Sequence, residues 1–257
     1  MVNTVEGNAS KFSNSDYRRA ELARRLQRVI MRPSDAKFNK ILRNNLLVNC
    51  PITSQDAKNA EAIFGPDVGS LKGKTVWRRP DKVVGVATGK RAPRRYRNVT
   101  IVADIMEVNK VKFLVTVSRH IKMHTIEVME TTTDHALIRA FKRVISQYWK
   151  GGFKVEYILG DNRFKSLDDD LEPTVNPTSN DEHSGDIERA IRTIKERMRA
   201  VVNTLPFEYL PRSIIRELGL ATVFWINSFP AEGGISDTQS PRELVTGRKI
   251  DFNKHCK

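Results

Sequence analysis

The stretch Val99-Thr-Ile-Val-Ala-Asp-Ile-Met-Glu-Val108 decides the fold, because it is rich in β-branched residues and yet carries a carboxylate in its middle. A run of this composition predicts a β-strand. An acid at Asp104, between apolar neighbours, indicates either a solvent-facing position on a half-exposed strand or a functional site. The choice between these two interpretations depends on what the neighbouring segments place beside it.

The segments that follow predict an α/β region. Two further strands, 111–118 and 121–128, are joined by very short turns, which is the pattern of an antiparallel meander. Apolar residues at helical spacing predict a helix over 134–150. The run 154–159 returns as a strand, and a right-handed crossover connection places it beside the first strand.

Beyond the fourth strand the chain changes character twice. The stretch 163–183 is polar and irregular, and we expect a mobile loop with a short helix near 164–167. Apolar spacing then predicts long helices over about 185–204 and 211–228. The second is almost entirely apolar over 220–226, so we expect it to pack against the sheet.

Two more acids occupy settings that complement Asp104. Asp161 follows the strand 154–159, and Glu188 opens the helix 185–204. Two neighbouring strands and a helix that each present a carboxylate supply the oxygen ligands that hard divalent cations prefer. Each acid also has a plain alternative: Asp104 turned to solvent, Asp161 as a strand-end cap, and Glu188 as a favourable charge near a helix N-terminus. The order of the three settings favours one shared metal site.

The helix that begins near Glu188 carries a row of cations. Arg192, Lys195 and Arg199 lie 4, 7 and 11 residues after Glu188, so all four share one face. A carboxylate and cations on one stripe fit a metal ion beside a phosphate backbone, and we interpret the three cations as DNA-binding. A solvated face with ordinary ion pairs is the alternative. The opposite stripe is apolar and predicted to be buried: Ile187, Ile191, Ile194, Met198 and Val201.

The positive charge is concentrated in the first part of the chain. The formal net charge is +14; residues 1–98 hold 21 Lys and Arg against 8 Asp and Glu (+13), while residues 99–257 hold 23 against 22 (+1). Such a block indicates a region that neutralises the phosphates of a polyanion. A solubilising, partly disordered leader is the other interpretation.

Residues 1–68 form a basic helical N-terminal region, in which 1–12 are expected to be disordered. The first helix is predicted to start from an N-cap at Ser15-Asp16, and a later one from a capping arrangement at Thr53–Asp56. Three short helices of this kind form either a nucleic-acid-binding bundle or a packing appendage. Residues 69–97 are predicted to be an extended basic linker, and 98–257 form the third region, which the family resemblance given below implies to be a catalytic core.

Composition argues against a membrane protein, a secreted protein and a protein built on disulfides or a zinc finger. The longest uncharged stretch near the end, 218–231, has 14 residues, whereas a membrane-spanning helix needs about 20. The first ten residues lack the pattern of a secretory signal, so we predict an intracellular protein without a membrane partner. Two cysteines, Cys50 and Cys256, give neither a disulfide framework nor a zinc finger.

At this point the sequence resembles the integrases of copia-type long-terminal-repeat retrotransposons, within the retroviral integrase superfamily. The resemblance covers nearly the whole chain and rests on these stretches: Ala103-Asp-Ile-Met-Glu-Val-Asn-Lys110, Ile158-Leu-Gly-Asp161, Asp181-Glu-His-Ser-Gly-Asp-Ile-Glu-Arg-Ala-Ile-Arg-Thr-Ile-Lys-Glu-Arg197, Phe224-Trp-Ile-Asn-Ser-Phe-Pro230 and Ser240-Pro-Arg-Glu-Leu-Val-Thr-Gly247.

The resemblance implies a ribonuclease H-like mixed sheet flanked by helices, with Asp104, Asp161 and Glu188 as a catalytic triad that binds Mg²⁺ or Mn²⁺. It implies a polynucleotidyl transferase that trims the 3′ end of element DNA and joins that end to target DNA. It places Arg192 and Lys195 against the DNA end. Nuclear localisation and a homo-oligomer are expected from the same resemblance.

Two departures from the family pattern keep other functions open. Residues 1–98 contain no His and only Cys50, so we predict no zinc site there. Only 26 residues separate Asp161 from Glu188, and Thr174-Val175 is all that stands where a fifth strand is expected. The alternatives are therefore a catalytically impaired, DNA-binding remnant of an integrase and a ribonuclease H-type hydrolase acting on an RNA–DNA hybrid.

Overall fold

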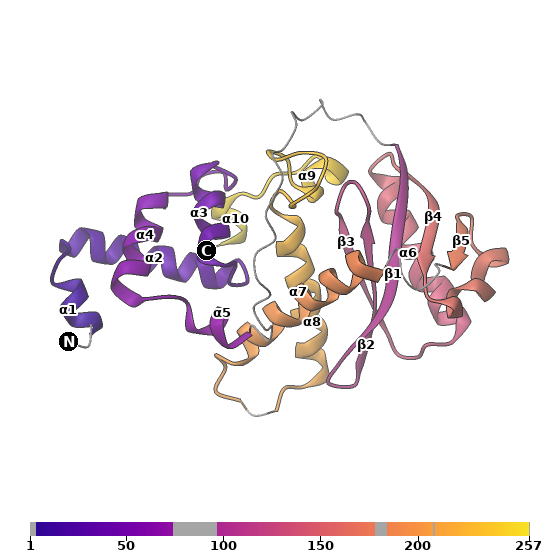
Figure 1. Cartoon of the computed structure of the whole chain (residues 1–257), viewed down its shortest axis with the longest axis horizontal. Helices are drawn as coiled ribbons and strands as arrows, with labels where there is room; N and C mark the ends of the chain where they lie inside the picture. The colour runs from indigo at the N-terminus through magenta and orange to yellow at the C-terminus, as the bar shows by residue number, and fades with distance from the viewer. Residues whose placement is uncertain (1–3, 74–96, 178–183, 208, 257) are drawn as a thin grey trace.

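A five-stranded mixed sheet forms the centre of the molecule in the computed structural model, which describes residues 4–73, 97–177, 184–207 and 209–256 (Figure 1). The sheet order is β3-β2-β1-β4-β5. The strands are β1 (Asn98–Val108), β2 (Val111–Ser118), β3 (His124–Met129), β4 (Lys154–Gly160) and β5 (Thr174–Pro177). Strands β1, β2 and β3 form an antiparallel meander, whereas β4 and β5 run parallel to β1. This order and these directions are those of a ribonuclease H-like sheet, so the predicted fold class is confirmed.

The connections follow from local backbone chemistry. Asn109 and Lys110 both have positive φ, 47° and 62°, and they close a two-residue hairpin between the paired residues Val108 and Val111. Two consecutive residues with positive φ match the right-handed twist of the flanking strands. The change to parallel pairing uses α6 (Asp134–Lys150), which carries the chain from β3 back to β4.

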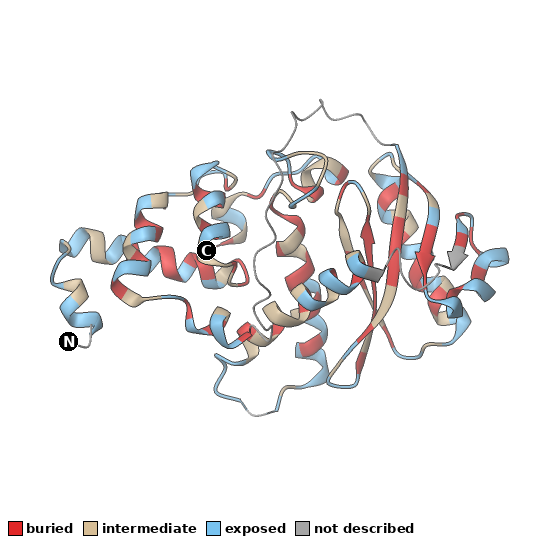
Figure 2. Cartoon of the chain, in the orientation of Figure 1, coloured by how far each residue is buried: buried red, intermediate tan, exposed pale blue. Residues whose placement is uncertain are grey.

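The two faces of the sheet have separate cores. Helix α6 and the 3₁₀ helix η1 (Asn162–Asp170) cover one face, and α7 (Ser184–Val202) and α8 (Arg212–Asn227) cover the other. Because side chains alternate along a strand, Ile101 and Ala103 of β1 belong to the α6-side core, while Val102 and Met106 belong to the α7-side core. In Figure 2, buried segments occur along the strands and on the helices that pack against the sheet.

The N-terminal helices are packed against the end of the chain. They are α1 (Val5–Ala9), α2 (Asn14–Val29), α3 (Asp35–Arg43), α4 (Ser54–Phe64) and α5 (Val68–Gly73). Their shared core also contains Trp225, Phe229, Ile250 and Cys256. The amide of Val48 donates to the carbonyl of Ile250 at 3.0 Å. In Figure 1, α7 and α8 lie between this helical region and the sheet. Helix α9 (Pro241–Thr246) lies above α8, and α10 (Phe252–His255) lies next to the N-terminal helices.

Several expectations for the N-terminal region need correction. The segment expected to be disordered contains the helix α1, which Thr4 caps by accepting from the amide of Gly7. The N-cap of α2 is Ser13, whose hydroxyl accepts from the amide of Asp16, so a cap at Ser15-Asp16 is wrong by two residues. The capping box of Thr53 and Asp56 is confirmed.

The predicted linker and loop are partly regular. Helix α5 includes residues 69–73, where the extended linker 69–97 was expected to begin, and residues 74–96 of that linker lie outside the described residues. After β4, the short helix predicted near 164–167 is confirmed as part of η1, and β5 occupies a further part of the expected loop by pairing with β4 from Tyr157↔Thr174 to Gly160↔Pro177. The fifth strand is therefore four residues long, longer than the two residues that the sequence indicated. Residues 178–183 of that loop lie outside the described residues. Strand β3 begins at His124 instead of residue 121.

The sequence analysis also made predictions about the cysteines and about membrane-spanning helices. Cys50 and Cys256 are both free thiols. Within the described ranges, no helix is long and apolar enough to cross a membrane.

Candidate active site on the face covered by α7

Asp104 lies in the middle of β1, opposite Val115 of β2. It has the same strand phase as Val102 and Met106, whose side chains belong to the α7-side core. The side chain is only partly exposed. Asp104 is therefore directed toward the face of the sheet that α7 covers, and a turn away to open solvent is not its setting.

Asp161 directly follows Gly160, which pairs with Ala103 on the parallel strand β1. Asp104 and Asp161 each come one residue after these paired residues, so the two acids lie at adjacent positions on the two neighbouring strands. Asp161 is exposed at the end of β4. Its carbonyl accepts from the amide of Phe164 at 2.9 Å, which starts the tight turn into η1.

Gly160 is a residue that the sequence reasoning did not single out. A Cβ at this position would lie 2.6 Å from Cδ2 of Phe164 and 2.8 Å from the carbonyl oxygen of Ala103. Only glycine leaves room for Phe164 to fold back against the strand, so Gly160 fixes the direction in which Asp161 leaves the sheet. The available signal was the glycine immediately before an acid at a strand end.

Glu188 lies on the exposed side of the first turns of α7, next to the buried Ile187. The start of this helix is anchored by Asp186, whose carboxylate accepts from Nζ of Lys122 at 3.0 Å and from Arg189. Burial acts to raise the pKa of Asp186, but the bonds from Lys122 and Arg189 outweigh it, and the pKa is lowered. Lys122, in the turn before β3, is thus a positioning residue for the helix that carries Glu188, and its sequence context gave no signal for this role.

The electrostatics of Asp104 connect the three acids. Burial raises the pKa of its carboxyl group, and the charges of Asp161 and Glu188 raise it further. The amide of Ile105, which donates to Oδ1 at 2.6 Å, and the charge of Lys195 act in the opposite direction. The two other acids predicted to share the site, and Lys195, thus act on the pKa of Asp104 through their charges.

The donor chemistry and the spacing of this site differ in how well they fit a metal ion. Three carboxylates are the oxygen donors that Mg²⁺ and Mn²⁺ prefer. Among the described residues, however, no three His, Cys, Asp or Glu side chains are grouped closely enough to hold one ion. The donor set thus fits a hard cation, and joint coordination requires the acids to move closer together.

The cationic stripe of α7 is arranged in two parts. Arg192 is exposed, while Lys195 and Arg199 are partly buried. Nε of Arg199 donates to the carbonyl of Lys195 at 3.3 Å, so this side chain folds back along its own helix. The opposite stripe was predicted to be buried, and Ile187, Ile194 and Met198 are buried in the α7-side core. Ile191 is only partly buried against that core, and Val201 is partly buried against the core of the N-terminal helices.

A second polar group on this face was not predicted. His124 begins β3, and its backbone amide and carbonyl are bonded by Asn227 of α8 at 2.8 and 2.7 Å. Burial lowers the pKa of its imidazole to about 4, and Nδ1 has no partner. Arg197 contributes a nearby charge, and burial lowers its own pKa to about 10. Arg197 lies three residues after Ile194, next to the buried stripe, and an arginine at such a position was a sequence signal that could have been noticed.

Solved structures with a similar fold include retroviral catalytic domains. The catalytic core domain of BIV integrase matches with 18% identity and a TM-score of 0.43, over 58% of this chain and 93% of that domain. The HTLV-2 integrase catalytic core domain in complex with magnesium, in a trimeric form, matches with 15% identity and a TM-score of 0.43, over 60% of this chain and 99% of that domain. No protein-family model and no curated protein matches the sequence.

Proposed function

We propose that this protein is an integrase-type polynucleotidyl transferase that processes the 3′ end of an element's DNA and joins it to target DNA. The observation that carries the proposal is the position of Asp104 on the sheet face that α7 covers, where burial first, and then the charges of Asp161 and Glu188, raise the pKa of its carboxyl group. A half-buried acid whose pKa is raised by two other carboxylates is a frequent mark of a catalytic site. The mixed sheet that bears it is of the ribonuclease H-like type.

In the proposed reaction, water first hydrolyses a phosphodiester near the end of the element strand and leaves a free 3′-hydroxyl. That hydroxyl oxygen then attacks a target phosphodiester, forming a new P–O bond while the target strand leaves with its own 3′-hydroxyl. Bound Mg²⁺ or Mn²⁺ supplies Lewis-acid stabilisation of the attacking and leaving oxygens. Asp104, Asp161 and Glu188 would hold these ions once the three carboxylates move closer together.

The cations of α7 serve the substrate in this proposal. Arg192 is exposed beyond Glu188 on the same helix face and binds a phosphate of the DNA end. Lys195, whose charge lowers the pKa of Asp104, balances the acids between turnovers. Arg199, whose Nε donates to the carbonyl of Lys195 on the same helix, also binds DNA in this proposal. Element DNA and target DNA are the partners, and a homo-oligomer in the nucleus is expected.

A strand-transfer assay with a labelled donor duplex, target DNA and Mg²⁺ or Mn²⁺ tests this function. We expect Asp104→Asn, Asp161→Asn and Glu188→Gln each to reduce joining to background, because each removes one metal-binding carboxylate. Glu107→Gln is the matched control, since Glu107 is an exposed acid on the same strand and outside the site. Joining that survives all three substitutions rejects the proposal.

One observation favours a second function, that of a DNA-binding remnant. The described residues contain no acid group compact enough to hold one ion. This alternative predicts salt-sensitive DNA binding by the wild-type protein, with no product in the joining assay and no effect of Mg²⁺ on the site. An RNA–DNA hybrid included as a third substrate separates both from a ribonuclease H-type hydrolase.

A further inference from the structure

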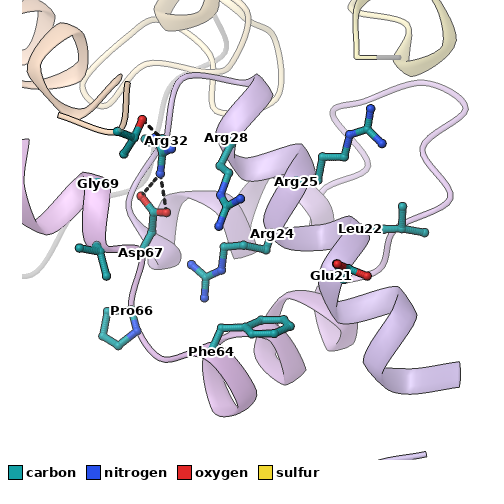
Figure 3. A pocket seen from close by; sticks show the side chains of 12 residues that line it. Glu21, Leu22, Arg24, Arg25, Arg28, Arg32, Phe64, Pro66, Asp67 and Gly69 are labelled. Carbon is teal, nitrogen blue, oxygen red and sulfur yellow. Dashed lines mark hydrogen bonds and ion pairs between the residues drawn. The ribbon is translucent and has the colours of Figure 1, made fainter. Parts of the chain in front are cut away.

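An arginine-lined cavity lies outside the acid site, where the N-terminal helices meet the end of α7. It measures about 750 Å³. Its walls come from α2, from the segment that follows α4, from α5 and from Thr204 just beyond α7 (Figure 3). Four lining residues are arginines: Arg24, Arg25, Arg28 and Arg32. With the two lining acids, Glu21 and Asp67, the wall has a formal charge of +2.

Two of the arginines build the wall. Arg32 donates through Nη1 to both carboxylate oxygens of Asp67, at 2.7 and 2.9 Å, and through Nη2 to the hydroxyl of Thr204 at 3.1 Å. Arg24 is buried and donates to the side chain of Gln27 and to the carbonyls of Ala60 and Gly65. Both guanidinium groups are therefore committed to holding α2 against its neighbours.

Among the residues that the structure describes, none forms a hydrogen bond or ion pair with the side chains of the remaining two arginines. Arg25 and Arg28 are both exposed on α2. In Figure 3 the guanidinium group of Arg28 points into the cavity toward Arg24, whereas Arg25 lies at the rim. Arg28 therefore extends a cation toward another that is already buried, a repulsive arrangement in which a bound anion would be stabilised by both.

The buried cation is incompletely compensated. Nε of Arg24 has no hydrogen-bond partner, and the carboxylate of Asp35 is 3.7 Å from Nη1. Burial lowers the pKa of Arg24, Asp35 and Asp67 act to raise it, and the charge of Arg28 lowers it. A buried, partly unpartnered guanidinium behind a free one is the arrangement that a phosphoryl group, with several acceptor oxygens, would complete.

We propose that this cavity binds a phosphoryl group, with Arg28 as the residue that bonds it directly, Arg24 as the fixed charge behind it and Arg25 at the rim. The ligand is a phosphate ester or polyphosphate, and the cavity is large enough for the group attached to it. The site uses none of the three acids, so it stands or falls independently of the proposed metal chemistry.

Calorimetric titration of the full-length protein with inorganic pyrophosphate tests the site. We expect Arg28→Gln to weaken binding about tenfold or more, the effect of losing a charged hydrogen-bond donor. Arg18→Gln is the matched control, because Arg18 is an exposed arginine of the same helix that does not line the cavity. Arg28→Lys should restore part of the affinity, and Asp104→Asn should bind like wild type.

Two results overturn the proposal: no binding of pyrophosphate to the wild-type protein at millimolar concentration, or equal weakening by Arg18→Gln and Arg28→Gln. A second titration, into protein saturated with duplex DNA, identifies the source of the phosphoryl group. Loss of the pyrophosphate signal assigns the cavity to a nucleic-acid phosphate. Retention of the signal assigns it to a free phosphorylated molecule.

Discussion

The two faces of the sheet treat their polar groups differently. On the face covered by α6, the hydroxyls of Thr116 and Thr125 bond each other at 2.8 Å, and the hydroxyl of Tyr148 donates to the carbonyl of Met123 at 3.2 Å. On the face covered by α7, Asp104 accepts from the amide of its own neighbour, and His124 Nδ1 is buried without a partner.

This difference has a physical meaning. Buried polar groups are nearly always satisfied where a surface serves only stability, because an unpaired group costs about 1–3 kcal/mol. Polar groups left with spare bonding capacity cluster where a ligand completes them. The α6 face is therefore the stabilising face of the sheet, and the α7 face is the one that we propose to be functional.

The largest expected effect is on the α6 face. Phe141 is fully buried and contacts Phe164 edge-on, with ring centroids 5.4 Å apart. We expect Phe141→Ala to lower the free energy of unfolding by about 3–5 kcal/mol, because it leaves a cavity in a close-packed core. Urea unfolding measures this. Trp149→Ala is the control on the same helix: Trp149 is 75% exposed, so its loss should change stability little.

A smaller effect is expected where the two faces are linked. Gly160→Ala places a Cβ against Phe164 on one side of β4, and we expect it to destabilise the fold by about 1–3 kcal/mol through overpacking. Since Asp161 follows directly, strand transfer should fall further than stability explains. Gly185→Ala is the control, because nothing lies within 4 Å of a Cβ there. Equal stability and activity in Gly160→Ala would show that the turn does not position Asp161.

The pairing of the two threonines gives a third test. Thr116→Val leaves the buried hydroxyl of Thr125 without its partner, so we expect a loss of about 1–2 kcal/mol in urea unfolding. The double variant Thr116→Val/Thr125→Val removes both polar groups and should recover much of that loss. If the double variant loses the sum of the two single effects, the pair is not the satisfied unit that distinguishes this face.

Sequence reasoning predicted the sheet well because its strands are long, β-branched and joined by short turns. The helix 134–150 matches α6 at both ends, and the strand 111–118 matches β2. The helix α1 and the fifth strand were missed or underestimated for a different reason. A five-residue helix and a four-residue strand are too short to show a clear helical or strand periodicity in the sequence.

The site residues divide in the same way. Asp104, Asp161 and Glu188 were visible because an acid in an apolar strand, at a strand end or at a helix start breaks a local pattern. Lys122 was not visible, since its role depends on Asp186, which only the fold brings near. Gly160 was overlooked although it immediately precedes an acid at a strand end, because its close contact with Phe164 appears only in the folded turn. The N-terminal region shares its core with Ile250 and Cys256, a contact that no local pattern encodes.

The contribution of Asp104, on the face covered by α7, to the free energy of unfolding should depend on pH. Because the folded-state pKa of Asp104 is raised above the ordinary value of 3.8, its ionised form destabilises the fold above that raised pKa. As the pH falls below 3.8, the group is protonated in both states and the cost disappears. With a chelator present, Asp104→Asn should therefore be more stable than wild type at neutral pH, and the two should converge in acid.

Thermal unfolding of wild type and Asp104→Asn at neutral pH, with chelator and then with excess Mg²⁺, tests the central claim most directly. We predict that Mg²⁺ raises the midpoint of the wild-type protein and reverses the order of the two, because the ion binds the folded acids and not the unfolded chain. A midpoint that Mg²⁺ leaves unchanged, or raises equally in both proteins, would contradict the assignment of Asp104 to a metal site.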